Sequence, residues 1–177
     1  MGFNLAPRTV SEWFAWAEES YLLGSAGIRS PSRKRIAQNY RKIYCCDWAM
    51  ATSVTGWSEK RTSRNLEAMV YWHLVRRGFD VSYDLAGPDK AEIDFIVARP
   101  GEAPFAAVQV CSDLAADATL AREMKGLSWY AGMNPGIRPC VIAPDGGPTG
   151  VAAVPNLLAV DFLLGIDSVF PGRLIAP

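Results

Sequence analysis

The sequence predicts an α/β domain in which a small mixed β-sheet is flanked by helices. Apolar residues recur at helical spacing in two segments, 62–77 and 117–131. Because a strand follows the second helix, that helix has to cross over the sheet, which predicts a layered core. Runs with strand character lie between and after the two helices, at 79–85, 91–97, 105–110 and 138–143.

The chain divides into an N-terminal part, residues 1–55, and a core, residues 56–177. The N-terminal part is expected to be a helical appendage to the core. It begins with an amphipathic helix at 9–23 and continues through a basic loop at 28–42. The short apolar run at 43–46 then predicts a buried strand.

Other local signals mark helix starts on both sides of the central elements. Asp47 is predicted to cap a helical turn that begins at Trp48. Near the C-terminal end we expect a short strand at 152–154. Asn156 is then expected to cap a helix at 156–164.

Several aromatic side chains are expected in the interior. Trp13, Trp16 and Trp48 suit helix packing. His73 lies on the apolar side of its helix, so we interpret it as a packed histidine rather than a base.

Composition sets limits on the class of protein. Half of the residues are hydrophobic and 20% are charged, which is typical of a globular domain. No uncharged apolar run reaches the length of about 18 residues that a membrane span needs, and no signal peptide is recognisable. The four cysteines form no C-x-x-C pair and one histidine is present, which argues against structural zinc. We therefore expect a cytoplasmic protein with free thiols.

The neutral net charge hides an asymmetry. Residues 1–78 carry twelve Lys and Arg against six Asp and Glu, whereas residues 79–177 carry six against twelve. The basic loop is the best candidate for contact with a nucleic-acid backbone. A solvated loop or a loop that docks on a partner protein is the alternative. The predicted nucleic-acid-binding residues are Arg33, Lys34, Arg35, Arg41 and Lys42.

Three polar residues stand in otherwise apolar surroundings: Glu67 on the first long helix, Asp94 on a strand and Gln109 on the next strand. Asp94 is the most informative, because Ile93 and Phe95 mark a buried strand and a buried carboxylate needs a metal or a donor. Neighbouring strands lie about 4.8 Å apart, so Asp94 and Gln109 can reach one ion if their registers match. The spacing therefore predicts a Mg²⁺ site.

Other roles remain open for these residues. Glu67 is equally consistent with a helix N-terminal acid stabilised by the macrodipole, and Gln109 with a satisfied polar residue of the sheet. Glu92 lies on the same side of its strand as Asp94. It is a second metal ligand, an ion-pair partner or an exposed residue.

An ordered series of short blocks resembles a known family, and together these blocks extend to about residue 165. The series resembles the uncharacterised C-terminal domain of bacterial and archaeal AAA-type ATPases, which has the PD-(D/E)XK nuclease fold. The blocks are Glu18 to Leu23, Lys42-Ile43-Tyr44 with Asp47, Leu66-Glu67, Val70-Tyr71, Arg77-Gly78, Glu92 to Val97, Val108-Gln109-Val110, Thr119 and Arg122-Glu123.

The resemblance implies a restriction-endonuclease-like three-layer core, a Mg²⁺ cofactor, and DNA or RNA as substrate. By the resemblance, Glu67 is the helical acid, Asp94 the metal-binding acid, and Gln109 the residue that opens the Q-x-K element. Cys111 stands where that element has lysine, and a thiol cannot supply the cation. Lys125, or else Lys90, is the candidate substitute.

The sequence leads to two functional hypotheses. The first is an accessory domain of an AAA-type ATPase that binds nucleic acid or a partner and carries a degenerate Mg²⁺-dependent phosphodiesterase site. The alternative is a non-enzymatic protein-interaction or oligomerisation module. No G-x-x-x-x-G-K-[ST] run occurs, so no nucleotide site is expected in this chain. Catalysis, oligomeric state and the identity of the partner are left open.

Overall fold

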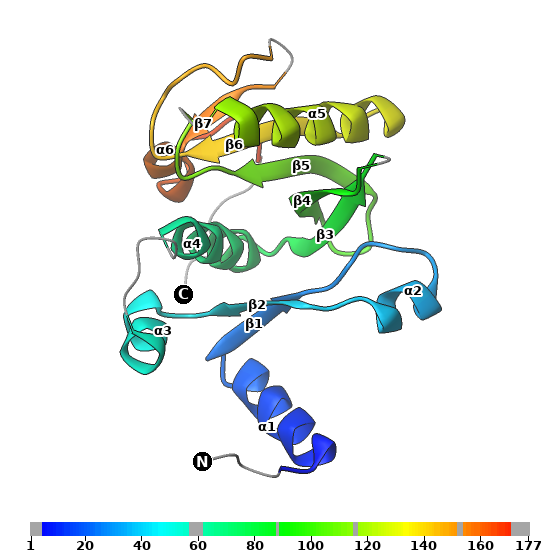
Figure 1. Cartoon of the computed structure of the whole chain (residues 1–177), viewed down its shortest axis with the longest axis vertical. Coiled ribbons are helices and arrows are strands. Elements are labelled where there is room, and N and C mark those ends of the chain that lie inside the picture. The colour runs from blue at the N-terminus through cyan, green and yellow to red at the C-terminus, as the bar shows by residue number, and fades with distance from the viewer. Residues whose placement is uncertain (1–4, 57–61, 88, 115–116, 152–153, 171–177) are drawn as a thin grey trace.

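The computed structural model describes residues 5–56, 62–87, 89–114, 117–151 and 154–170 (Figure 1). No helix in these ranges is long and apolar enough to cross a membrane. The helices are α1 (Pro7–Glu19), α2 (Arg33–Gln38), α3 (Trp48–Thr55), α4 (Thr62–Arg76), α5 (Asp117–Met133) and α6 (Ala159–Leu163). The strands are β1 (Leu23–Ala26), β2 (Lys42–Cys45), β3 (Asp80–Ala86), β4 (Ala91–Ala98), β5 (Pro104–Val110), β6 (Arg138–Ala143) and β7 (Asn156–Leu158).

A mixed five-stranded sheet forms the centre of the molecule. Its strand order is β3-β4-β5-β6-β7. Strands β3, β4 and β5 are antiparallel, whereas β6 pairs parallel with β5 and with β7. Helix α5 covers one face of the sheet, and α4 and α6 lie on the other (Figure 1). The expected mixed α/β sheet flanked by helices is therefore confirmed.

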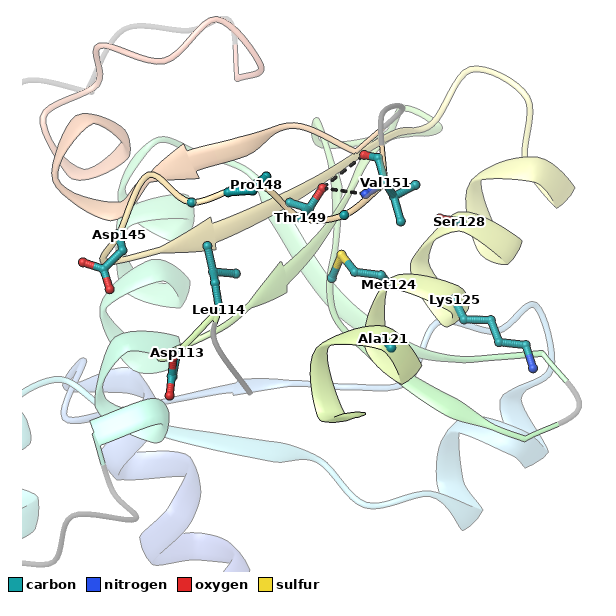
Figure 2. Close-up of a pocket in the computed structure, with 12 residues that line it drawn as sticks. Asp113, Leu114, Ala121, Met124, Lys125, Ser128, Asp145, Pro148, Thr149 and Val151 are labelled. Carbon is teal, nitrogen blue, oxygen red and sulfur yellow. Dashed lines mark hydrogen bonds between the residues drawn. The ribbon is translucent and has the colours of Figure 1, made fainter. Parts of the chain in front are cut away.

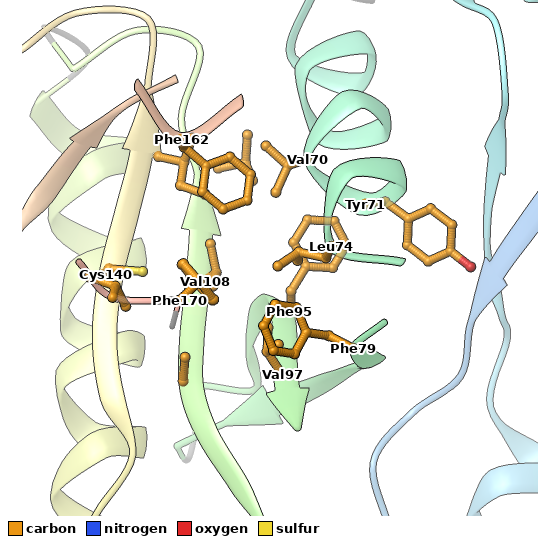
Figure 3. Packing of buried hydrophobic residues seen from close by; sticks show 14 of the residues in the cluster. Val70, Tyr71, Leu74, Phe79, Phe95, Val97, Val108, Cys140, Phe162 and Phe170 are labelled. Atoms are coloured by element: carbon orange, nitrogen blue, oxygen red, sulfur yellow. The ribbon is translucent and has the colours of Figure 1, made fainter. Parts of the chain in front are cut away.

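The face that carries α4 holds the larger apolar cluster. Val70 and Leu74 of α4 pack against Phe95 of β4, Val108 of β5 and Phe162 of α6 (Figure 3). All five side chains are buried. Burial of one such side chain stabilises the folded state by about 1.5–3 kcal/mol, so this cluster holds α4 firmly on the sheet.

The opposite face packs against α5. Met124 and Leu127 of the helix contact a cluster that includes Ile93 and Ile96 of β4. The helix approaches the strand closely at Gly126, where an added Cβ would stand 2.7 Å from that of Ala91. The glycine therefore permits the close contact between helix and sheet.

A β-bulge in β4 decides which side chains face the two layers. Ser82 pairs with Ile96 and Asp84 with Ile93, so two steps along β3 correspond to three along β4. Ile93 and Ile96 consequently both face α5, although simple alternation would put them on opposite faces. A bulge typically redirects a side chain, and here the extra residue falls at Asp94 and Phe95.

Strands β1 and β2 form an antiparallel hairpin that lies below α4 (Figure 1). Tyr44 of β2 stacks on Tyr71 of α4, with ring centroids 4.3 Å apart. The Tyr71 hydroxyl donates to the Ser25 carbonyl at 3.2 Å, and Tyr71 points toward the hairpin (Figure 3). A Cβ added to Gly24 would lie 2.5 Å from this ring, so the tyrosine fits beneath β1 because residue 24 is glycine.

The segment after β1 also closes part of the sheet edge. The Arg29 N–H donates to the Tyr83 carbonyl at 2.7 Å, and the Tyr83 N–H donates to the Gly27 carbonyl at 3.0 Å. Ala26, Ile28 and Tyr44 are buried in the core. In contrast, α1 has no buried residue. The domain boundary at residue 55 stays a prediction.

Some local predictions are wrong. Trp13, Trp16 and Trp48 are 51%, 60% and 53% exposed rather than packed in the interior. Neither α1 nor α3 has a buried residue, so both helices lie at the surface of the described part of the chain. His73, in contrast, is buried and packs edge-on against Phe162, as expected.

The two ends of the chain hold further differences. Strand β1 and helix α2 lie where the sequence predicts a helix end and a loop. Asn156 belongs to β7 rather than capping a helix, because its amide N–H₂ donates to the carbonyls of Asp145 and Gly147. The predicted strand at 152–154 falls largely outside the described residues. The Asp47 cap is confirmed, since its carboxylate accepts from the N–H groups of Ala49 and Met50.

Candidate functional site

Asp94 lies where strands β4 and β5 diverge. Their ladder ends at the pair Phe95 and Val108, so the Val110 N–H has no carbonyl of β4 to bond. The Asp94 carboxylate replaces that carbonyl, with Oδ2 accepting from Val110 N at 2.9 Å. Asp94 is 7% exposed. A buried carboxylate with one backbone donor still needs a cation.

Lys42 supplies that cation from the hairpin. Its Nζ lies 2.9 Å from Asp94 Oδ1, 2.8 Å from Glu67 Oε1 and 2.7 Å from Glu92 Oε1. We call these four residues the acidic cluster. Its members come from β2, α4 and β4, so three separate parts of the fold meet at one ammonium group.

Two tyrosines hold the carboxylates of the acidic cluster. The Tyr44 hydroxyl donates to Glu67 Oε1 at 2.7 Å. The Tyr40 hydroxyl donates to the second oxygen of Glu92. Tyr44 is buried whereas Tyr40 is 58% exposed, so the Glu67 side of the cluster is interior and the Glu92 side is near solvent.

The environment shifts the titration of the cluster. Burial, and less strongly Glu67, raise the pKa of Asp94 to about 7, because Lys42 and the Val110 N–H offset only part of this effect. Burial alone would lower the pKa of Lys42, but the attraction of Asp94 and Glu67 outweighs it and raises that pKa. Lys42 is therefore charged throughout the accessible pH range.

Gln109 of β5 lines a pocket next to the acidic cluster. A pocket of about 180 Å³ is lined by Glu67, Glu92, Asp94, Gln109 and Glu123, among others. Gln109 is 4% exposed, and its Oε1 has no hydrogen-bond partner among the described residues. Buried amide oxygens are normally bonded, so an unpartnered one in an acidic pocket points to a ligand with positive charge or a donor.

Cys111 lies beside the pocket and remains a thiol. Its Sγ lies 3.1 Å from Glu123 Oε2, to which the S–H donates. Burial raises the pKa of Cys111, and the hydrogen bond to Glu123 raises it further. The residue therefore adds no charge to the site.

Neither Lys125 nor Lys90 lies in the acidic cluster, so the substitution of either one for the missing lysine stays a prediction. The Lys125 ammonium is 3.7 Å from Asp89, and the Lys125 side chain is 79% exposed. It lies beside a different cavity, of about 740 Å³, between α5 and the loop at 145–151 (Figure 2). Residues two apart on a helix face different directions, so Lys125 points away when Glu123 lines the acidic pocket. Lys90 is exposed in the turn before β4.

The basic segment divides into engaged and exposed residues. Arg35 pairs with Asp84 at 3.2 Å, and Arg41 with Glu18 at 3.4 Å. Arg33 and Lys34 are exposed on α2. Lys42, predicted to contact nucleic acid as a loop residue, is instead a strand residue inside the acidic cluster.

Glu67, Asp94 and Gln109, predicted to meet, do line one pocket. The sequence does not predict that Lys42 and Tyr44 contact these acids. The sequence does contain a signal for this contact: residues 42 and 44 are two apart in a short strand, so their side chains share one face. A lysine and a tyrosine on the inward face of a strand predict a buried acidic partner.

The arrangement is compatible with a divalent cation, although it is not a preformed cage. Among the described residues, no group of three or more His, Cys, Asp or Glu side chains is placed to hold a metal ion. Glu67 and Asp94 supply two carboxylates, and Gln109 Oε1 supplies a neutral oxygen. Mg²⁺ commonly uses one or two carboxylates and completes its coordination with water. These residues therefore fit Mg²⁺ as a partly hydrated ion.

Comparison with known proteins adds no relative. No family model matches the chain, and no curated protein or solved structure is significantly similar to it.

Proposed function

We propose that this protein is a nuclease-like domain that binds nucleic-acid phosphate through a divalent cation held at Glu67, Asp94 and Gln109. The observation that carries the proposal is the buried, unpartnered Oε1 of Gln109 in a pocket that also contains the carboxylates of Glu67 and Asp94. A purely structural ion pair between Lys42 and the acids would leave that oxygen without a role.

The element order around the pocket supports the same proposal. A helix that carries Glu67 precedes three antiparallel strands, a crossing helix and a parallel strand. This is the order that the sequence pattern predicts, with Glu67 on the first of these helices and Asp94 on the second strand. When bound, Mg²⁺ would supply a water of lowered pKa and neutralise phosphate charge.

The chain's own residues would bind and orient the substrate. Glu67 and Asp94 hold the cation, Tyr44 fixes the Glu67 carboxylate, and the Val110 N–H fixes that of Asp94. Exposed Arg33 and Lys34 on α2 add positive charge a few residues before Tyr40. Such charges contribute affinity for a phosphate backbone in a salt-dependent manner.

Thermal unfolding with and without Mg²⁺ or Mn²⁺ tests the cation site. At a concentration about 100-fold above Kd, the ion should raise Tm by about 5 to 10 °C. Asp94→Asn keeps a hydrogen-bonding side chain of the same shape but removes the charge, so the rise should disappear. Glu102→Gln is the control, because Glu102 pairs with Arg99 at the surface. An equal rise in wild type and Asp94→Asn would refute the site.

A second candidate function is supported by the surface of α1. Trp13 and Trp16 are more than half exposed on a helix with no buried residue. Exposed aromatic residues are enriched in protein interfaces. A module that docks on a partner such as an ATPase domain would use this surface, and it would require neither metal nor nucleic acid. Absence of both metal and oligonucleotide binding would favour this second function.

A further inference from the structure

The contacts of Lys42 differ in how deeply they lie. The side chain of Asp94 is 10% exposed and that of Glu67 is 18% exposed, whereas that of Glu92 is 35% exposed. Lys42 itself is 12% exposed. The ammonium therefore has two interior acceptors and one acceptor on its solvent side, and the solvent side is where a ligand would enter.

Glu92 is held in place by a surface tyrosine rather than by the core. Tyr40 donates to its outer oxygen and stacks on Tyr83 with ring centroids 5.2 Å apart. The Tyr83 hydroxyl in turn donates to the Tyr40 carbonyl at 2.8 Å. This arrangement presents the inner oxygen of Glu92 to Lys42 without burying the carboxylate. The contact can therefore be exchanged without disturbing the packed core.

The charge of the acidic cluster opposes phosphate binding, and exchange of the Glu92 contact would remove part of that opposition. Three carboxylates surround one ammonium, so an approaching phosphate would meet net negative charge. A phosphate oxygen and a carboxylate oxygen are equivalent acceptors for an ammonium N–H. If a divalent cation takes Glu67 and Asp94, Glu92 is the remaining carboxylate that competes with the phosphate for Lys42.

We propose that Lys42, carried into the site by the β1–β2 hairpin, is the phosphate-binding cation of this domain, and that Glu92 occupies the phosphate's place on it until nucleic acid binds. This inference rests on the proposed cation site and deepens it. Lys42 thus compensates for Cys111, whose buried thiol donates to Glu123 and adds no charge to the site. The N-terminal hairpin becomes part of the substrate site.

The proposal predicts opposite effects for the two partners. Lys42→Met should raise the Kd for an oligonucleotide at least about 10-fold, because a charge-assisted contact is lost. Lys42→Arg should restore most of the affinity. Glu92→Gln should lower Kd about 3-fold or more, because a competing charge is removed while the side-chain shape is kept. Arg138→Met is the control for loss of one positive charge, since Arg138 is exposed at the start of β6.

The measurement is fluorescence anisotropy with labelled DNA and RNA oligonucleotides of one sequence in Ca²⁺, which replaces Mg²⁺ to limit turnover. Thermal unfolding of each variant establishes that it is folded. Calorimetric titration with Mn²⁺ establishes separately whether the cation site is present. Use of both nucleic acids identifies which of them the site prefers.

The outcomes separate the two proposals. If wild type binds no Mn²⁺, the proposed function fails and this inference fails with it. If wild type binds Mn²⁺ and oligonucleotide but Lys42→Met retains wild-type oligonucleotide affinity, the role of Lys42 is refuted and the proposed function stands. If wild type binds Mn²⁺ but neither oligonucleotide, the proposed function and this inference both fail, although a cation site is present. If Glu92→Gln raises the Kd for both Mn²⁺ and oligonucleotide, Glu92 is a metal ligand rather than a placeholder for phosphate, and the inference is overturned.

Discussion

At the scale of single residues, Asp94 connects the fold to the proposed chemistry. Its position at the end of the β4–β5 ladder makes it both a replacement for a backbone acceptor and a partner of Lys42. Loss of either contact would leave a buried polar group without a partner, which typically costs about 1–3 kcal/mol or more. The residue is therefore constrained by stability as well as by the proposed function.

His73 gives a prediction that is independent of the candidate site. Burial and, less strongly, the charges of Arg77 and Arg76 together lower the pKa of His73 from 6.5 to about 4. Because the unfolded chain takes up the proton near pH 6.5 and the folded chain does not, stability is lost as pH falls from that value toward 4. The contribution of His73 to this loss should be roughly 2 to 3 kcal/mol by about pH 4.

Urea unfolding at about pH 7 and about pH 4 measures this loss. His73→Phe keeps an aromatic ring against Phe162 but cannot take up a proton. The variant should therefore lose less unfolding free energy between the two pH values than wild type does. An identical loss in both proteins would contradict the assignment of a depressed pKa to His73.

The sequence predicts the three pocket residues but not their cation, for a physical reason. A carboxylate in an apolar strand is conspicuous, because its desolvation needs compensation. A lysine in a basic stretch is not, because most lysines are solvated. Lys42 lies in the acidic cluster and Lys34 does not, because the register of the hairpin turns Lys42 inward. That register depends on pairing with β1, a strand that the sequence does not predict.

At the scale of secondary structure, the hairpin is the element on which the site depends. It carries Lys42 and Tyr44 on one face, and, besides the bonds of these two side chains to Glu67, α4 donates two hydrogen bonds to the hairpin backbone. The Trp72 indole N–H donates to the Cys45 carbonyl at 3.0 Å, and the Tyr71 hydroxyl donates to that of Ser25. The position of Lys42 is consequently set in part by contacts between α4 and the backbone of the two strands.

Two glycines of the hairpin region offer a matched test of this dependence. Gly24→Ala should destabilise the protein by about 1–3 kcal/mol, because the new methyl group overlaps the Tyr71 ring. Gly27→Ala meets nothing within 4 Å and should leave stability unchanged or raise it by up to about 1 kcal/mol. Denaturant unfolding of both variants checks the difference. Equal stability would show that Tyr71 moves aside without cost.

Elements with strong periodicity are predicted well and those defined by tertiary contact are not. The boundaries of α4, β4, β5, α5 and β6 match the sequence prediction to within about two residues. In contrast, β1 contains the small residues Gly24 and Ser25, and its sequence shows no alternation of large apolar and polar residues. The β4 bulge also escapes prediction, because it appears only when β3 and β4 are paired.

At the scale of the whole molecule, opposite charges of the two chain halves meet inside the fold. The basic first half contributes Lys42 and Arg35, and the acidic second half contributes Asp94, Glu92 and Asp84 as their partners. The sequence predicts the asymmetry and interprets it as a surface for nucleic acid. Part of that charge is instead neutralised internally, which leaves a smaller exposed basic surface on α2.

Truncation tests whether the N-terminal part is an appendage. A fragment of residues 47–177 lacks the hairpin, so the acids lose Lys42 and the core loses Ala26, Ile28 and Tyr44. Removal of one partner of a buried ion pair alone costs about 3–5 kcal/mol, so Tm should fall by at least about 6 °C. A fragment of residues 20–177 lacks only α1 and should unfold within about 3 °C of the full chain. Similar Tm values for both fragments would show that the core folds without the hairpin.

The short pairing of Gly27 and Arg29 with Tyr83 has a consequence for the protein in a crowded solution. The free N–H and carbonyl groups of an outermost strand can recruit a strand from another molecule, which begins aggregation. Here the chain itself occupies those groups at Tyr83 on β3. The same segment that leads from β1 toward Lys42 thus shields one border of the sheet from intermolecular strand addition.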